Sequence, residues 1–434
     1  MLFNYVIGKT LAKSNDDRVK KNGKQISRKS ILTISIIANL ALLGYFKYAD
    51  FLIENFNLAF DSTMPLLNLA LPLAISFFTF QQIAYLVDSY RRETHEYDFL
   101  NYAIFVTFFP QLIAGPIVHH KEMMPQFANI RTKVINYRNI TLGLFIFSIG
   151  LFKKVVIADT FSVWANAGFD TEATLNLFEA WATSLSYTFQ LYFDFSGYTD
   201  MAIGLALLFN IKLPINFNSP YKSTNIQDFW RRWHITLSRF LRDYIYIPLG
   251  GNRINRFRTY LNLMATFILG GLWHGAGWTF VFWGFLHGIA LVIHRLWSQL
   301  GIKLWTWLAW LVTFNFINIT WVFFRAEEWS EAIKVLKGMF TLDNIMLPNG
   351  LQGRLPNIEG YQINYGEWLS SINGDKWTIV WIVVAMLSVI LLKNSIQMTL
   401  SFRVNKFYLI YTVLVMCTAL SFLNTASEFL YFNF

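Results

Sequence analysis

The chain has 434 residues, of which 55% are hydrophobic, 18% aromatic and only 14% charged, with a mean hydropathy of +0.38. A soluble domain carries about a quarter charged residues, so this composition excludes a soluble or a disordered protein and indicates a polytopic membrane protein. The single cysteine, Cys417, excludes an internal disulfide framework, and the net charge of +10 predicts basic cytoplasmic loops rather than a nucleic-acid interface.

The N-terminal segment 1–30 is rich in Lys and Arg and lacks the apolar core and cleavage site of a signal peptide. Because basic loops stay on the cytoplasmic side, we expect it to be a cytoplasmic segment ahead of a membrane domain over 31–434. The same rule places the basic loop 212–258 in the cytoplasm, where it either stays or re-enters the membrane. Residues 326–340 have an amphipathic pattern, so 326–376 is expected to hold an interfacial helix and an extracytoplasmic loop.

Stretches of about 20 predominantly apolar residues predict membrane-spanning helices. In chain order these stretches are 31–53, 64–87, 139–164, 178–195, 259–274, 277–299, 303–325, 377–393 and 406–424. Two weaker stretches, 99–118 with its prolines and 196–210 with its Ser-Gly pair, are predicted to enter the membrane only halfway. Broken segments at membrane depth require protein or water around them, so they predict a cavity. The expected fold is all-α, with about nine full spans, re-entrant or half helices, and the C-terminus outside.

Residues 226–244 combine aromatic side chains with arginines and are predicted to form one helix at the cytoplasmic boundary. Two pairs of opposite charge stand four residues apart on this helix and can meet there: Asp228 with Arg232, and Arg239 with Asp243. The arginines either anchor the helix at the membrane surface or bind the phosphates of a ligand, and both alternatives remain open. The arginines concerned are Arg231, Arg232, Arg239 and Arg242.

The motif LGGLWHGAGW places His274 directly after Trp273 and among glycines that include Gly271 and Gly275. Glycines remove side-chain bulk and let another helix or a thin substrate approach the backbone. A histidine inside an apolar segment is a functional candidate because burial is costly, and burial favours the neutral imidazole that a general base needs. The alternative is a histidine that is hydrogen-bonded between two helices.

A second histidine, His234, lies in the predicted boundary helix, with Trp230 and Ser238 four residues before and after it. Its presence within reach favours a functional role for both histidines. His287 and His294 are expected to serve packing or an interface instead. No HxxxH or HExxH pair occurs, so a metal site is not predicted.

The motif LYFDFSGYTDMAIG places Asp194, Tyr198 and Asp200 at or near membrane depth. Unpaired carboxylates there are costly, so they are expected to pair with arginines, to orient a histidine, or to form a structural ion pair. Lys153 and Lys154 are expected to extend toward the interface, or the span that contains them is shorter. The sequence has no Walker A motif, no GxGxxG after a strand and no GxSxG, so a histidine base is the remaining chemistry with a motif.

These stretches resemble the membrane-bound O-acyltransferase (MBOAT) family, and most closely its bacterial branch of alginate O-acetyltransferase proteins. The motifs that carry the resemblance are PQLIAGPIV (110–118), LYFDFSGYTDMAIG (191–204), NFNSPY (216–221), DFWRRWHITLSRFLRDYIYIPLGGNR (228–253), RTYLNLM (258–264), GGLWHGAGWTFVFWG (270–284) and EFLYFNF (428–434). The resemblance implies a ring of tilted helices around a tunnel that joins a cytoplasmic donor to an acceptor site opening outward. It also implies two apolar helices ahead of a segment like NYVIG (4–8), so we expect a truncated chain or a late start.

The resemblance implies that His274 is the catalytic histidine, which takes the proton from an attacking hydroxyl. His234 matches a second family position and would hydrogen-bond the thioester carbonyl or orient the acceptor. The implied donor is acetyl-CoA or another acyl thioester, with no permanently bound cofactor, and the implied acceptor is a polysaccharide. The residues expected to bind the substrates are Asp228, Trp230, Arg231, Arg232, Ser238, Trp273, Gly271, Gly275, Asp194 and Tyr198.

Similar bacterial proteins act in the cytoplasmic (inner) membrane, among its lipids, with an extracytoplasmic SGNH-type partner that finishes the transfer. One alternative is D-alanyl transfer to teichoic acid, which the IPLGGNR and EFLYFNF motifs disfavour. A second is a transporter without chemistry, against which stands the lack of an inverted repeat. A third is an inactive scaffold that recruits a partner.

Overall fold

The computed structural model describes residues 1–13, 18–21, 24–94, 98–342, 344–354, 363–423 and 429–430. These parts of the chain are mainly helical. The helices are α1 (Leu2–Lys13), α2 (Arg28–Lys47), α3 (Ala49–Phe60), α4 (Ile75–Tyr90), α5 (Phe99–Thr107), α6 (His120–Ala128), α7 (Tyr137–Phe152), α8 (Asp159–Asp170), α9 (Leu177–Leu208), α10 (Ile226–Arg232), α11 (Ile235–Leu241), α12 (Arg256–His274), α13 (Trp278–Gln299), α14 (Thr306–Arg325), α15 (Trp329–Phe340), α16 (Lys376–Leu391), α17 (Ser395–Ser401) and α18 (Lys406–Ser421). The strands are β1 (Arg18–Lys21), antiparallel to β2 (Lys24–Ser27), and β3 (Ile345–Pro348), parallel to β4 (Ile363–Gly366).

Several helices have the length and apolarity to cross a membrane. Within the described residues four do so alone: Arg28–Lys47, Tyr137–Asp170, Trp278–Gln299 and Thr306–Arg325. The bent pair of α16 and α17, which meet at 49°, makes a fifth if it is counted as one span. An all-α membrane protein is therefore confirmed, whereas the number of about nine full spans stays a prediction.

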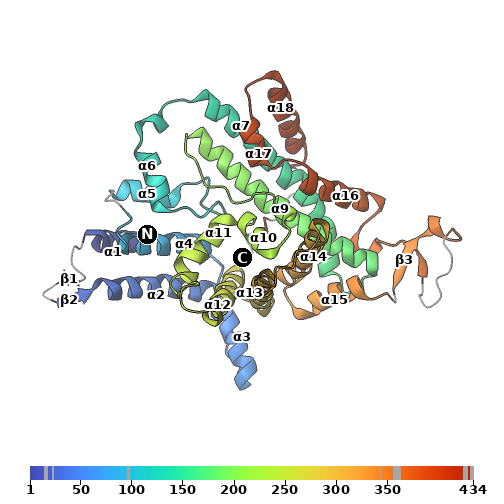
Figure 1. Cartoon of the computed structure of the whole chain (residues 1–434), viewed down its shortest axis with the longest axis horizontal. Coiled ribbons are helices and arrows are strands. Elements are labelled where there is room, and N and C mark those ends of the chain that lie inside the picture. The colour runs from blue at the N-terminus through green and yellow to red at the C-terminus, as the bar shows by residue number, and fades with distance from the viewer. Residues whose placement is uncertain are drawn as a thin grey trace.

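Two short helices, α10 and α11, lie near the middle of the molecule, with α4, α9, α12, α13 and α14 around them (Figure 1). Aromatic contacts join the central pair to each of these neighbours. The ring pairs are Phe80–Phe240 at 4.1 Å, Phe195–His234 at 4.7 Å, Trp230–Phe267 at 5.0 Å, Trp230–Trp283 at 5.8 Å and Trp233–Trp321 at 5.0 Å. Aromatic residues, which make up 18% of the chain, thus form a packed core around the segment with the densest motifs.

The long helix α9 runs without a break from Leu177 to Leu208. The prediction that 196–210 forms a separate half-buried segment is therefore wrong. Gly197 serves close packing instead, because a Cβ there would lie 2.7 Å from the carbonyl oxygen of Gly150 on α7. Small residues of this kind let two membrane helices approach each other without interrupting either of them.

Two other predicted spans differ from the structure. The stretch 31–53 is divided at Tyr48 into α2 and α3, and only the later part of 64–87 is helical, from Ile75 onward. Prolines that include Pro72 precede α4; they lack an amide hydrogen and disfavour helix in the residue before them.

Two other expectations about helices agree with the structure. The amphipathic pattern over 326–340 becomes α15, and the stretch 99–118 becomes the short helix α5 followed by irregular chain. The sequence does not predict α1, which packs on α2 and α4. Asn4 and Asn39 exchange hydrogen bonds of 2.9 and 2.8 Å across the first of these contacts.

Candidate active site

The predicted helix over 226–244 is divided at His234, so the expectation of one continuous helix is wrong. His234 lies between α10 and α11 and has a left-handed φ of 43°. This conformation is uncommon for residues other than glycine and persists only where the surrounding structure holds it. The break turns the chain at the histidine, which is fully buried, instead of aligning its side chain with those of Trp230 and Ser238.

The side chain of Asn216 holds this turn. Its Oδ1 accepts hydrogen bonds from the backbone N–H and the hydroxyl of Thr236, at 3.2 and 2.9 Å, and lies 3.1 Å from Nδ1 of His234. Because a backbone N–H can only donate, this atom is the acceptor, and Nδ1 of His234 carries the hydrogen. In its neutral form His234 therefore has its lone pair on Nε2.

Thr236 joins the same turn to the proline-containing segment after α5. Its hydroxyl accepts a hydrogen bond of 3.0 Å from the backbone N–H of Ile117. Two motifs more than a hundred residues apart, PQLIAGPIV and the His234 motif, are thereby fixed against each other. Neither Asn216 nor Thr236 was among the predicted site residues, although Asn216 opens the NFNSPY motif.

His274 is the last residue of α12 and is 4% exposed. Aromatic rings surround its imidazole: Trp273 at 4.9 Å, Trp283 at 5.3 Å and Phe324 at 5.0 Å between ring centroids. Apolar walls of this kind exclude water, which strengthens any electrostatic interaction that the imidazole makes with a bound group.

Close packing of α12 on α13 requires the glycines around His274. A Cβ on Gly271 would lie 2.3 Å from the carbonyl oxygen of Phe280, and one on Gly275 would lie 2.1 Å from the Phe280 ring. Of the two interpretations of these glycines, the approach of another helix is therefore the one that the geometry supports.

Two residues from the α2–α3 junction hold the end of α12, and sequence analysis missed both. The Lys47 ammonium donates to the carbonyl oxygens of Trp273 and His274, at 2.6 and 3.0 Å, and the Tyr48 hydroxyl donates to that of Leu272 at 2.7 Å. The last carbonyls of a helix have no partner within it, so these bonds fix the helix end that carries the histidine. A lysine in the apolar stretch 31–53 was the signal that could have identified Lys47.

The structure brings the two candidate histidines together around Trp273. The Trp273 ring lies 6.4 Å from the ring of His234 and 4.9 Å from that of His274. Residues that are 40 positions apart in the chain therefore share one buried aromatic pocket.

A cavity of about 920 Å³ is lined by Gly275, the residue that follows His274, although His274, His234 and Trp273 do not themselves line it. Its wall includes Gly275, Phe280 and Phe324, and also Lys47 and Arg325. Phe324 both lines the cavity and has its ring centroid 5.0 Å from that of the His274 imidazole, so one aromatic residue lies between the histidine and the cavity wall.

Three of the four arginines predicted to lie at the cytoplasmic boundary form ion pairs with carboxylates. Arg232 pairs with Asp228 as predicted, with its Nε 3.0 Å from both carboxylate oxygens. The predicted pair of Arg239 with Asp243 does not form. Arg239 pairs with Glu122 at 2.6 Å, Arg242 pairs with Asp243 at 2.7 Å, and Arg231 is exposed.

The side chains of Trp230 and Ser238 form hydrogen bonds within the protein. The Trp230 indole N–H donates to Nδ1 of His287 at 3.2 Å, which agrees with the packing role expected for that histidine. The Ser238 hydroxyl donates to the Trp230 carbonyl oxygen at 3.2 Å and so bridges the break between α10 and α11.

The buried carboxylates pair with lysines, not with arginines. Asp194 lies 2.9 Å from Lys154, and Asp200 lies 2.6 Å from Lys153. Both lysines belong to a π-helical turn between α7 and α8, which directs them inward, so they do not extend toward the interface. Of the alternatives for these carboxylates, the structural ion pair is the one observed.

The C-terminal motif reaches the same region. Asp194 also accepts the backbone N–H of Leu430 at 3.2 Å, and Phe429 packs on Tyr198 at 4.8 Å between ring centroids. The other residues of EFLYFNF lie outside the described residues. Through Leu430 this segment also lines the cavity beside His274.

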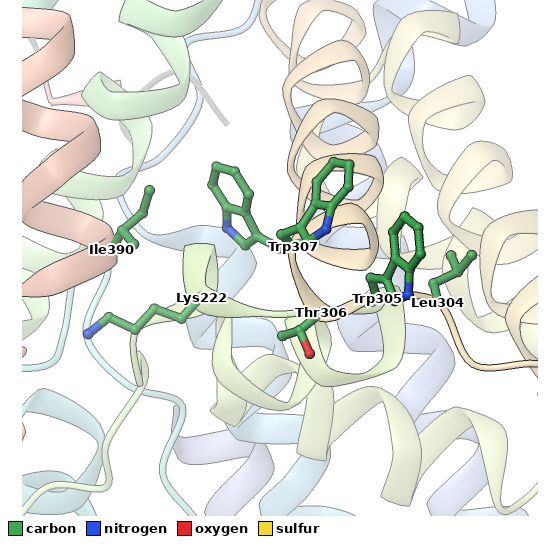
Figure 2. A pocket seen from close by; sticks show the side chains of 7 residues that line it. Lys222, Leu304, Trp305, Thr306, Trp307 and Ile390 are labelled. Carbon is green, nitrogen blue, oxygen red and sulfur yellow. The ribbon is translucent and has the colours of Figure 1, made fainter.

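A separate groove of about 1080 Å³ lies at the start of α14. Figure 2 shows its tryptophans opposite Lys222 and Ile390. None of its lining residues belongs to the predicted site. In the described parts of the chain there is also no group of three His, Cys, Asp or Glu side chains suited to a metal ion.

Comparison with known proteins defines the class. Residues 25–326 match the MBOAT (membrane-bound O-acyltransferase) family. The chain is 51% identical to a peptidoglycan O-acetyltransferase of Helicobacter pylori, over 93% of this chain and 82% of that protein. It is 44% identical to a probable alginate O-acetylase AlgI of Pseudomonas aeruginosa, over 71% of this chain and 60% of that protein. A teichoic acid D-alanyltransferase of Bacillus subtilis is 28% identical over 60% of this chain and 70% of that protein.

The chain therefore belongs to the membrane-bound O-acyltransferase family, as its motifs predict, and it is an acyltransferase. The family match includes the His234 turn, the end of α12 and Lys47, so the buried pocket around Trp273 lies within the part of the chain that the family shares.

Proposed function

We propose that this protein transfers an acetyl group from acetyl-CoA, on the cytoplasmic side, to a hydroxyl group of a cell-surface polysaccharide. The observation that carries the proposal is the pair of buried histidines around Trp273, in a membrane domain, with a cavity whose wall includes the neighbouring residues Gly275 and Phe324. The relatives named as acetyltransferases of peptidoglycan and alginate support acetyl as the group and a polysaccharide as the acceptor.

In the proposed reaction the acceptor oxygen attacks the carbonyl carbon of the thioester. His274 accepts the hydroxyl proton as the new C–O bond forms, and the C–S bond then breaks. The proton passes from His274 to the leaving thiolate, so the products are an O-acetyl ester and a free thiol. General-base assistance of this kind contributes about 10²- to 10⁴-fold to a rate.

The hydrogen bond to Asn216 supports one of the two roles considered for His234. With its Nδ1 hydrogen engaged, the neutral ring presents an acceptor at Nε2. An acceptor atom can bind the O–H of a second hydroxyl of the acceptor, next to the attacking one, but cannot donate to a thioester carbonyl. We therefore assign His234 to orientation of the acceptor through that second hydroxyl, which leaves the proton of the attacking hydroxyl to His274.

On the donor side, Arg231 is the arginine best suited to phosphate contacts because it is exposed, whereas Arg232, Arg239 and Arg242 already pair with carboxylates. Asp228 positions Arg232 within this group. The proposal places the donor site in the bacterial cytoplasm, and the full set of about nine spans in the inner membrane. It also includes an extracytoplasmic SGNH-type partner on the acceptor side.

The test uses the full chain in lipid vesicles, with acetyl-labelled coenzyme A and a β-1,4-linked N-acetylglucosamine tetrasaccharide as acceptor. His274→Ala is expected to lower kcat by about 10²- to 10⁴-fold. The matched control is His294→Ala, in a histidine outside the aromatic pocket, which should keep wild-type activity. A folded His274→Ala protein with full transfer would refute the assignment.

The same assay distinguishes the other candidate activities. Transfer of D-alanine from a D-alanyl thioester, with no acetyl ester formed, would replace acetyl by D-alanyl. Passage of the acceptor across the vesicle membrane without any ester would indicate a transporter. Neither activity has a structural feature in its favour that acetyl transfer lacks.

A further inference from the structure

The groove at the start of α14 combines several tryptophans with a lysine. Trp305, Trp307 and Trp310 form its wall opposite Lys222 (Figure 2). Trp305 and Trp307 are 72% and 60% exposed, and their stacked rings lie 6.1 Å apart. In membrane proteins tryptophans gather at the level of the lipid headgroups, where one part of the ring is in an apolar and the other in a wet environment. The groove therefore has the composition of a site at the boundary between membrane and water.

A second hollow, of about 370 Å³, adjoins the groove and lies between α13 and α14. Leu304 lines both, so the two are neighbours. The wall of the hollow is mainly apolar and includes Ile293 and Val312, which are exposed at the surface of the protein. Both helices are long and apolar enough to cross a membrane, so we expect exposed apolar side chains on them to face lipid. The hollow is thus suited to hydrocarbon, next to a groove that carries a charged group.

The charges around the groove are all positive. Three segments build the groove and contain no Asp or Glu: 209–227, 286–325 and 376–406. Lys222 lines the groove, and Lys303 directly precedes Leu304 in its wall. The Lys222 ammonium donates a hydrogen bond of 2.7 Å to the carbonyl oxygen of Leu392, which Lys393 follows. This bond uses one of the three ammonium hydrogens. The groove is therefore complementary to a ligand with a negative charge.

The hydrogen bond of Lys222 also indicates the side of the membrane. The basic segments 212–258 and 393–406 are both expected in the cytoplasm. Lys222 belongs to the first of them and Leu392 directly precedes the second, so their contact brings both segments to the groove. The loop between α13 and α14 forms part of the groove wall and lies at the same end. Anionic lipids of the cytoplasmic leaflet attract lysines at this level.

We propose that the groove and the adjoining hollow form one binding site for an anionic phospholipid of the cytoplasmic leaflet. The phosphate binds at Lys222, and an acyl chain enters the hollow between α13 and α14. A nucleotide could use the lysine and the tryptophan rings but would leave the apolar hollow empty, whereas a phospholipid has both a phosphate and a chain. The lining residues lie outside the predicted catalytic and substrate-binding set, so this inference does not depend on the proposed acetyl transfer.

The experiment measures lipid binding to the full chain in detergent, by native mass spectrometry and by thermal unfolding. The two probes are dioleoyl phosphatidylglycerol and dioleoyl phosphatidylcholine, which have the same chains and differ in net charge. The wild type should bind phosphatidylglycerol more tightly, and its unfolding midpoint should rise with the concentration of that lipid. Lys222→Gln should weaken phosphatidylglycerol binding about fivefold, the effect of one lysine near an anionic surface, and should affect phosphatidylcholine less.

Lys212→Gln is the matched control. Lys212 is an exposed lysine of the same basic segment, but it lines neither the groove nor the hollow. Its replacement makes the same change of charge and should leave the affinity for phosphatidylglycerol at the wild-type value. A loss as large as that of Lys222→Gln would mean that the lipid responds only to the total surface charge, and it would overturn the site.

Ala309→Phe tests the hollow separately from the charge. Ala309 lines the hollow but not the groove, and a phenyl ring there occupies the space assigned to the acyl chain. Both phospholipids should therefore bind about tenfold more weakly, the effect of roughly two methylene groups kept out of an apolar pocket. Thermal unfolding without lipid shows whether this variant folds, and Lys222→Gln decides the question if it does not.

Three other results would overturn the inference. One is equal affinity of the wild type for the two phospholipids. The second is a higher KM for acetyl-CoA in Lys222→Gln with unchanged lipid binding, which would assign the groove to the donor. The third is a loss of self-association in that variant with unchanged lipid binding, which would assign the groove to a second copy of the chain. Full transfer by His274→Ala would instead refute the proposed function and leave the lipid site unaffected.

Discussion

The two buried histidines are held in place by different means. His234 is held through its ring, by a side-chain oxygen of Asn216, in a strained turn between two short helices. At His274, Lys47 and Tyr48 bind the last backbone carbonyls of α12, and aromatic rings surround the imidazole.

This difference indicates different roles for the two histidines in the proposed reaction. A ring nitrogen fixed by a hydrogen bond defines one tautomer and one direction for a non-reacting hydroxyl of the acceptor, which suits orientation. A histidine fixed through its backbone, within an apolar enclosure, is suited to accept a proton and release it again. Variants that alter one kind of support at a time test whether the two histidines have these different roles.

The largest effect is expected from the support of the His234 ring. Asn216→Leu removes the oxygen that accepts three hydrogen bonds, so His234 loses its fixed tautomer, and we expect kcat to fall by about 10²-fold. Asn216→Asp keeps an acceptor oxygen at that position and should retain much more activity than Asn216→Leu. Steady-state acetyl transfer with both variants tests this, and equal losses would show that the amide acts only as a structural element.

An intermediate effect is expected at the end of α12. Lys47→Met removes two bonds to the helix end and should lower kcat by about tenfold, with little change in either KM. Tyr48→Phe removes one neighbouring bond and should cost about threefold or less. Both variants are compared by transfer kinetics and by thermal unfolding. If both variants lose the same kcat, in proportion to their loss of stability, Lys47 only caps the helix and does not position His274.

The smallest effect is expected from Thr236→Val. This change removes one of the three hydrogen bonds to Asn216 and the acceptor for Ile117, but it leaves the bond between Asn216 and His234. We expect a loss in kcat of about threefold. Thr266→Val, which removes a buried hydroxyl bonded to Asn262 within α12, is the matched control and should have no effect on kcat. A larger loss than that of Asn216→Leu would make Thr236 the principal support of the turn.

Features that depend on neighbouring residues, namely helices and short-range ion pairs, were predicted well from the sequence. Apolar runs predicted most of the helices, and the pairing of Asp228 with Arg232 followed from their spacing. Local patterns failed where a residue acts on another segment. The sequence around Gly197 suggested a helix break, but Gly197 packs against α7 within a continuous helix. The helical pattern over 226–244 gave no sign of the turn at His234, which is stabilised by Asn216, a residue outside that segment.

The amino-acid sequence was enough to identify a helical membrane protein of the acyltransferase family and to predict a site at His234 and His274, because apolarity and motifs are properties of neighbouring residues. Only the tertiary structure decided that both histidines meet around Trp273, that lysines rather than arginines neutralise Asp194 and Asp200, and that Lys47 holds the end of α12. These contacts join residues from about 40 to more than 200 positions apart, and their partners are set by helix packing in three dimensions, which local spacing does not encode.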